Sequence, residues 1–192
     1  MAGTAVLGRL TWLAAKVAGT REETPRVRTL ELEAPGWGGH RAGQHLDVRL
    51  TSEDGYEAQR SYSIASAPDD ALAITVERLE DGEVSPYLVD DVRPGDAFEL
   101  RGPIGGWFTW EAAQGGPLLL VAGGSGLVPL MAMLRHRRIS GSDAEAKLLL
   151  SARTPQSVLY AAELGELSQL DGIDVAITYT REAPPGWSGP TG

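Results

Sequence analysis

Residues 60 to 63 read Arg-Ser-Tyr-Ser and place a cation, an aromatic ring and two hydroxyls within one short extended stretch. Because successive side chains of a strand point to opposite faces, Arg60 and Tyr62 share one side and the two serines share the other. Arginine offers a planar fork of donors that suits phosphate oxygens, and a tyrosine ring can stack on a flat heterocycle. The tetrapeptide therefore suits a flavin nucleotide, although an exposed arginine and tyrosine on an ordinary strand would have the same pattern.

A second candidate site is the glycine-rich turn Gly123-Gly124-Ser125-Gly126, which follows an apolar run and precedes a helical pattern. Glycines permit positive φ and close backbone approach, and a helix N-terminus offers free amide donors to a pyrophosphate. Ser125 can cap the helix or touch the ligand. Pro129 lies in the first helical turn, where its missing N–H costs nothing, but it replaces the last glycine of the dinucleotide fingerprint. A simple tight turn is therefore the alternative.

The elements that must position these residues change character near residues 115–117. Before that point, short β-rich runs separated by turn signals predict a six-stranded antiparallel barrel. One helix is predicted over 84–92, with Ser85 as its N-cap and Pro86 at the first helical position. The predicted strands are 10–17, 27–34, 45–50, 56–64, 72–79 and 97–100.

After that point the pattern is βαβαβ, which predicts a doubly wound parallel nucleotide-binding fold. The apolar run 118–122 is typical of a parallel strand that is covered on both faces. We place the domain boundary between residues 113 and 114, so that the domains are 1–113 and 114–192. The predicted strands are 118–122, 147–152 and 175–180, and the predicted helices are 127–138 and 161–170.

Composition excludes several other classes of protein. The 192 residues contain no cysteine, so that thiol catalysis and cysteine-ligated clusters must come from another chain, if they occur at all. A formal net charge of −9 argues against a nucleic-acid partner. The apolar runs are too short to span a membrane and the N-terminus does not have the pattern of a secretory signal, so we expect a cytoplasmic protein.

The histidines and the basic residues suggest no further chemistry. His40, His45 and His136 do not have metal-ligand spacing, so no metal site is predicted, and a hydrolase or a metalloenzyme is disfavoured. The basic run 135–138 ends a predicted helix, where cations favour the dipole. A docking patch for an acidic partner is the alternative interpretation of that run.

Three motifs in a fixed order make the whole chain resemble the ferredoxin–NADP reductase family. These flavoproteins also include cytochrome b5 reductases, flavodoxin reductases and the reductase components of oxygenases. The family motifs are Arg-x-Tyr-Ser, Gly-x-x-Ser and Gly-Gly-x-Gly-x-x-Pro, and they match residues 60–63, 82–85 and 123–129. The resemblance implies a flavin-binding barrel followed by an NAD(P)-binding domain.

By this resemblance, Arg60 would hold the flavin pyrophosphate, Tyr62 would stack on the flavin, and Ser63 would contact its reactive ring nitrogen. The segment 75–77 matches the strand beside the flavin, and residues 82–85 would contact its phosphates. FAD is expected rather than FMN. The complete set of predicted cofactor-binding residues is Arg60, Ser61, Tyr62, Ser63, Thr75, Val76, Glu77, Gly82, Val84, Ser85, Gly124, Ser125, Gly126, Pro129, Arg153, Thr180 and Arg181.

The choice of pyridine nucleotide depends on the ends of the second and third parallel strands, which meet the adenosine ribose in such folds. Arg153 ends the second strand, and Thr180-Arg181 aligns with a Ser-Arg pair that contacts the 2′-phosphate in family members that use NADPH. No acidic residue that would bind a bare ribose hydroxyl is apparent. NADPH is therefore favoured over NADH.

One departure from the family pattern affects the nucleotide domain. Family members continue after the third strand with a helix and two further strands, including a Cys-Gly-x-Pro segment, whereas this sequence ends at Gly192. Without the further strands, strand 118–122 is expected at an open sheet edge. The nucleotide domain is therefore expected to be incomplete, and hydride transfer depends on the missing part more than flavin binding does.

The sequence leaves three functions to compare. The first is an oxidoreductase that passes electrons from NAD(P)H through FAD to a separate iron–sulfur or flavin-containing carrier, such as a ferredoxin, a flavodoxin or an oxygenase component. The second is a flavin-binding relay or regulatory module that no longer uses NAD(P)H. The third is a structural protein that kept only the architecture. In the first, the flavin carries the chemistry, and no acid–base residue is required.

Overall fold

The first half of the chain forms a curled antiparallel sheet, in a computed structural model that describes residues 10–191. The strand order is β4-β3-β6-β1-β2-β5. The edge strands β4 and β5 meet only near the Ile64–Ile74 bridge, so the predicted barrel is confirmed but is not fully closed. The strands are β1 (Leu13–Thr24), β2 (Val27–Glu33), β3 (His45–Thr51), β4 (Glu57–Ser63), β5 (Ala73–Glu77) and β6 (Ala97–Ile104).

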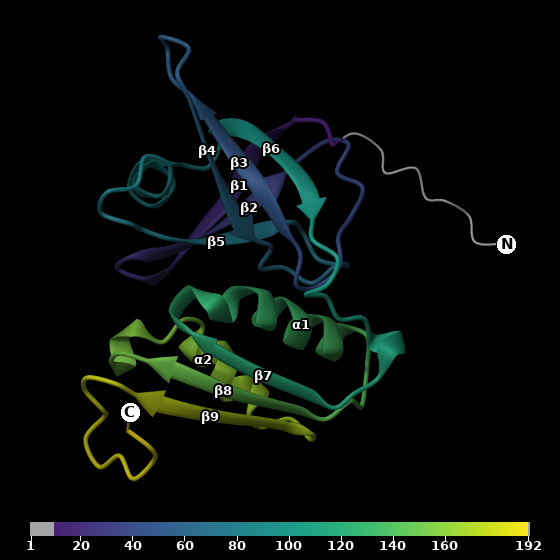
Figure 1. The fold of residues 1–192 in the computed structure, drawn as a ribbon, viewed down its shortest axis with the longest axis vertical. Helices are drawn as coiled ribbons and strands as arrows, with labels where there is room; N and C mark the ends of the chain where they lie inside the picture. Colours follow the sequence, from purple (N-terminus) through teal and green to yellow (C-terminus); the bar gives the residue numbers. More distant parts are fainter. Residues whose placement is uncertain (1–9, 192) are drawn as a thin grey trace, which may run out of the picture.

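Apolar side chains at every second position of the strands fill the interior of the barrel. Leu46 and Val48 of β3 are fully buried and belong to one apolar core with Leu30 of β2, Ile74 of β5 and Leu100 of β6. Their apolar side chains lie on one face of the curled sheet because side chains on a strand repeat every second residue. The opposite face carries charged residues of β3 and β6, where Asp47 pairs with Arg101 and Arg49 pairs with Glu99. Figure 1 shows the curl of this sheet.

The helix of the barrel is shorter than the sequence predicts. It is a single π-type turn, η1 (Tyr87–Asp91), and no side chain caps it. The hydroxyl of Ser85 instead accepts a hydrogen bond from the backbone N–H of Leu79 at 3.0 Å. The side chain of the predicted N-cap therefore closes the preceding turn and does not cap η1.

The second half is a parallel sheet with the order β7-β8-β9, so that β7 lies at an edge, as expected. Figure 1 shows α1 between this sheet and the barrel. The elements are η2 (Ala112–Gln114), β7 (Leu118–Gly123), η3 (Gly124–Gly126), α1 (Leu127–Ile139), β8 (Ala146–Ala152), η4 (Pro155–Ser157), α2 (Ala161–Leu167) and β9 (Ile173–Tyr179).

The apolar strand β7 is covered on one face only within the part of the chain that the structure describes. Leu120 is buried under the helices, whereas Leu119 and Val121 are 78% and 66% exposed. The expectation that both faces are covered is therefore wrong for residues 10–191. Alternating side chains of a strand face opposite sides, so a single helical layer can bury only every second residue.

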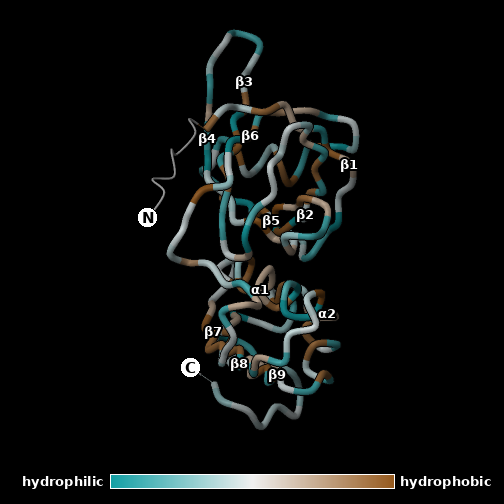
Figure 2. The backbone as a smooth tube through the Cα atoms, turned by 90° about the vertical axis from the view of Figure 1, so that its right-hand side faces the viewer, coloured by the Kyte–Doolittle hydropathy of each residue, from teal (hydrophilic) through white to brown (hydrophobic). Residues whose placement is uncertain are grey.

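The two halves meet across α1, as the side view in Figure 2 shows. Val27, Ala42 and Ala65 from the barrel half belong to the same apolar core as α1 and β8. Between residues 10 and 191, none of the helices has the length and apolar character needed to cross a membrane. The boundary at residues 113 and 114 stays a prediction.

Candidate functional site

Arg60 and Tyr62 lie on the core-facing side of the edge strand β4. They pair with Val48 and Leu46 of β3, which are fully buried. Tyr62 is half-buried and packs on the barrel core, whereas the Arg60 side chain is 55% exposed. Burial raises the pKa of Tyr62 to about 12, against a smaller opposing effect of the Arg60 charge. The phenol therefore stays neutral next to the cation.

The turn 79–85 lies next to Arg60. The Gly82 backbone N–H donates to Leu79 O at 3.0 Å, and a Cβ on Gly82 would lie only 2.8 Å from Ser85 Oγ. Glycine is therefore required at Gly82 by the tightness of the turn. Glu83 in this turn approaches Arg60 Nη2 at 3.6 Å. The fold thus brings together the motifs at 60–63 and 82–85, which are distant in the sequence.

The side chain of Ser61 points away from Arg60. It donates a hydrogen bond to Asp47 at 2.6 Å, and Arg101 donates to the other carboxylate oxygen at 2.6 Å. Burial alone would raise the pKa of Asp47, but these two hydrogen bonds outweigh it and hold that pKa below its usual value. Ser63 pairs with His45 on the same outer face. The structure therefore gives Ser61 a role in cross-strand pairing.

The side chains of Thr75 and Val76 are buried and cannot face a ligand. Thr75 Oγ1 lies 2.7 Å from the hydroxyl oxygen of Thr29 and accepts a hydrogen bond from Tyr160 OH at 2.6 Å. Because β5 is an edge strand, only its free backbone edge could contact a flavin there. Glu77 at the end of β5 is half-exposed and is the member of this segment that reaches a cavity.

That cavity lies between the two halves of the chain and has a volume of about 610 Å³. Its walls come from the β1–β2 turn, the end of β5, the glycine turn after β7 and the segment that follows β8. Residues that the sequence predicts separately therefore meet in one place. The predicted residues that line it are Glu77, Gly124, Ser125, Arg153 and Thr180.

The glycine turn leaves room for a ligand. Gly123 is extended (φ −135°, ψ 134°), and a Cβ added there would meet only Ser151 O at 3.8 Å. Gly126 has helical angles and no atom of the protein within 4 Å of an added Cβ. Only Gly124, at φ +53°, needs glycine for its own backbone. Neither packing nor backbone geometry requires glycine at Gly123, which lines the cavity, so this part of the turn leaves room for the phosphates of a dinucleotide to approach the backbone. The structure does not explain the glycine at Gly126.

Ser125 lines the cavity, and the N-cap position of α1 is Gly126, so Ser125 does not occupy the capping position. Its contact with a ligand stays a prediction. Gly126 and Pro129 shape the first turn of α1 but do not line the cavity. Arg153 lines it, whereas Arg181 lies outside. The backbone N–H of Arg181 donates to Arg153 O at 3.0 Å, so the two arginines mark neighbouring strand ends.

Some lining residues were not predicted. Thr24, Pro25 and Arg26 come from the β1–β2 turn, which carries no nucleotide motif. The segment 154–157 forms a capping box in which the Ser157 hydroxyl accepts from the Thr154 N–H at 3.0 Å. Its Thr-Pro-x-Ser pattern, which begins two residues after the end of the predicted strand 147–152, could have indicated this turn from the sequence.

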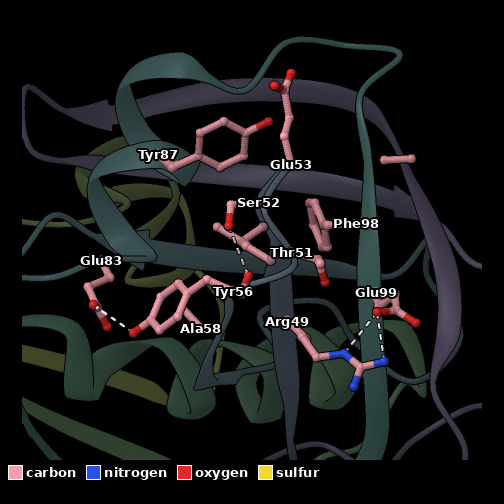
Figure 3. A pocket seen from close by; sticks show the side chains of 12 residues that line it. Arg49, Thr51, Ser52, Glu53, Tyr56, Ala58, Glu83, Tyr87, Phe98 and Glu99 are labelled. Carbon is pink, nitrogen blue, oxygen red and sulfur yellow. Dashed lines mark hydrogen bonds and ion pairs between the residues drawn. The ribbon is translucent and has the colours of Figure 1, made fainter.

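A second cavity, of about 750 Å³, lies beside Glu83 on the barrel (Figure 3). Tyr56, Tyr87 and Phe98 provide its aromatic walls, and Arg49 pairs with Glu99 at 2.8 Å on its rim. These residues come from the β3–β4 hairpin, η1 and β6. No sequence motif joins them, and only the fold reveals the cavity.

Two family models cover most of the chain. Residues 16–109 match the oxidoreductase FAD-binding domain, and residues 120–192 match the oxidoreductase NAD-binding domain. The ferredoxin–NADP reductase B of Sorangium cellulosum is 36% identical over 183 residues, which cover 93% of this chain and 73% of that protein. The NADH oxidoreductase HCR of Escherichia coli is 34% identical over 144 residues, which cover 74% of this chain and 44% of that protein.

Solved structures have the same architecture. The FAD/NAD-binding domain of a nitric oxide dioxygenase from Vibrio cholerae aligns with a TM-score of 0.80 at 24% identity, and the alignment covers 90% of this chain and 76% of that one. A cytochrome P450 reductase from Amycolatopsis gives 0.81 at 26% identity and covers 98% and 59%. The chain spans less than half the length of several curated relatives, including those from Escherichia coli and Mycobacterium tuberculosis.

Proposed function

Because the chain belongs to the ferredoxin–NADP reductase family, we propose that it takes electrons from NAD(P)H and passes them through FAD to a separate acceptor protein. The observation that carries this proposal is the cavity between the domains, where Glu77, predicted beside the flavin, meets residues predicted for the NAD(P) site. A cavity at the junction of two domains, at the carboxyl end of parallel strands, is the usual position for such a ligand.

The flavin site proposed here is the opening of the barrel between β4 and the turn 79–85. Arg60 would bind phosphate oxygens with its exposed guanidinium, and Tyr62 would present an uncharged ring to the flavin. Gly82 keeps the turn close enough to reach the same phosphates. The cavity beside Glu83 has aromatic walls suited to an adenine, which favours FAD over FMN.

The nucleotide site proposed here is the cavity of about 610 Å³ between the domains. Gly123 and Gly124 would let a pyrophosphate approach the backbone at the start of α1. Arg153 is the cation best placed for a 2′-phosphate, which favours NADPH, and Arg181 is the second candidate from outside the cavity wall.

The protein's part in the reaction is positioning. Bound flavin supplies the redox chemistry, and the chain contributes binding, orientation and electrostatics. Glu77 belongs to the barrel and Ser125 to the nucleotide domain, so the two halves jointly fix where the nucleotide lies. Related chains include the reductase components of a propane 2-monooxygenase and of a glycine betaine monooxygenase, so an oxygenase component or a ferredoxin is the acceptor we propose.

The test starts with flavin binding. Purified protein should show a visible flavin spectrum or gain one with added FAD, and NADPH should bleach it without oxygen. Arg60→Ala should weaken FAD binding by about 1.5–3 kcal/mol, the scale of a charged hydrogen bond. Absence of flavin uptake would reject the proposal. Flavin uptake without bleaching by NADPH or NADH would instead favour a relay or regulatory module.

A further inference from the structure

The carboxylate beside Arg60 belongs to the turn that we propose for the flavin phosphates. Glu83 Oε2 lies 3.6 Å from Arg60 Nη2, and Glu83 Oε1 accepts a hydrogen bond from Tyr56 OH at 2.9 Å. Figure 3 shows the Tyr56 ring extending along the cavity toward Glu83. One side chain therefore uses both carboxylate oxygens, one toward the cation and one toward the phenol of the residue that precedes β4.

We propose that Glu83 competes with the flavin phosphates for Arg60, so that the chain supplies an anion at its own flavin site and this anion lowers flavin affinity. The inference rests on the proposed function, because it requires Arg60 to bind phosphate. It concerns the second position of the Gly-x-x-Ser turn, whose side chain the sequence motif leaves open.

The contact between Arg60 and Glu83 is weak enough for a phosphate to replace the carboxylate. The Arg60 and Glu83 side chains are 55% and 53% exposed, and exposed ion pairs contribute little because water screens them. A phosphate carries more charge than a carboxylate and presents several acceptor oxygens to the guanidinium fork. The phosphate should therefore displace Glu83 from Arg60. The lost Arg60–Glu83 contact and the nearby carboxylate charge should weaken flavin binding by a measurable amount.

The contacts of the turn 79–85 hold the backbone of Glu83 in place, so a backbone shift cannot move Glu83 away from Arg60. Gly82 N–H bonds to Leu79 O, Ser85 Oγ bonds to Leu79 N–H, and Val84 is fully buried next to Glu83. Only side-chain rotation can remove the carboxylate from Arg60. The Tyr56 hydroxyl restrains that rotation; its hydrogen bond to Glu83 and the carboxylate charge raise the pKa of Tyr56, so the phenol remains a donor. A flavin phosphate thus meets a negative charge held close to its binding site.

The test compares Glu83→Gln with the unchanged protein after the flavin has been removed from both. Glutamine keeps the size of the side chain and an oxygen acceptor for Tyr56 but removes the charge. Fluorescence titration should give FAD and FMN dissociation constants that are more than twofold and up to about fivefold lower for Glu83→Gln, the scale of an exposed charge pair. Riboflavin has no phosphate, and its dissociation constant should change less than about twofold, which we take as the precision of the titration.

Glu33→Gln is the matched control, because Glu33 is exposed on β2 and lines neither of the two cavities, and the substitution makes the same change in net charge. It should leave all three dissociation constants within the precision of the titration. FAD binding that is unchanged or weaker in Glu83→Gln would overturn the inference, as would tighter riboflavin binding or an equal effect of Glu33→Gln. Those outcomes leave the proposed function intact, whereas absence of flavin binding by every variant would overturn both.

Discussion

Arg135 is the side chain whose removal should most weaken the junction between the two halves of the chain. It is nearly buried in α1, and its guanidinium donates to both oxygens of Glu163 at 2.9 and 2.5 Å and to the backbone oxygen of Ala65 at 2.6 Å. It also lies 4.7 Å above the Tyr160 ring. Arg135→Ala would leave a half-buried carboxylate and a buried carbonyl without this partner.

The expected loss follows from these contacts. Removing one partner of a fully buried ion pair costs about 3–5 kcal/mol, and because the Glu163 side chain is 21% exposed, we expect about 2–4 kcal/mol. Urea denaturation of the full chain would measure it. Arg138→Ala is the control in the same helix, because Arg138 is exposed and should change the free energy of unfolding by less than about 0.5 kcal/mol. A loss below about 1 kcal/mol for Arg135→Ala would refute the reasoning.

The pH dependence checks the same pair. Burial alone would raise the pKa of Glu163, but the hydrogen bonds and charge of Arg135 outweigh it and hold that pKa below its usual value. A lowered carboxyl pKa contributes stability that is complete above the unfolded-state pKa and is lost as the pH falls through the folded-state pKa. The difference in the free energy of unfolding between the wild-type protein and Arg135→Ala should therefore be constant at neutral pH and shrink below about pH 4.

Three further substitutions test other parts of the structure. Tyr160→Phe should lower the free energy of unfolding by about 1–1.5 kcal/mol in urea denaturation, because it removes a buried hydrogen bond to Thr75; no change would contradict that contact. Gly123→Ala should leave the folded chain as stable as before, since nothing crowds the added methyl, yet raise the dissociation constant for NADPH in a fluorescence titration; unaltered affinity would place the nucleotide elsewhere. Arg153→Ala should raise the Michaelis constant for NADPH more than for NADH, and more than Arg181→Ala does; equal effects on both nucleotides would argue against a 2′-phosphate contact.

The sequence predicts the parts of this fold that local pattern determines. Turn signals and period-two alternation locate the barrel strands, and the apolar run followed by glycines locates β7 and α1. The first strand is the least accurate, because β1 continues to Thr24 through residues that are polar on both faces. Hydrogen bonding to β2 defines that extension, and a pattern of hydrophobic residues cannot show it.

The basic run 135–138 shows what local pattern cannot supply. The sequence permits two interpretations of this run, a helix end or a docking patch for an acidic partner. In the structure, Arg135 and Arg137 are buried. Arg137 donates to the backbone oxygens of Ala144 at 2.5 Å and Asp171 at 3.1 Å. Both arginines bind groups that only the tertiary fold brings near, so the docking interpretation fails because two of the four basic side chains point inward.

Strand β5 connects the two candidate sites and explains why they must be considered together. Near its start, Ile74 bridges to Ile64, the residue directly after Ser63 in the flavin motif. At its middle, Thr75 accepts the hydrogen bond from Tyr160 of the nucleotide domain, and at its end Glu77 lines the cavity between the domains. A shift of β5 would therefore move the barrel opening and the cavity wall at the same time. If flavin and nucleotide bind as proposed, this short edge strand sets the distance between them, and the buried side chain of Thr75 keeps its register fixed.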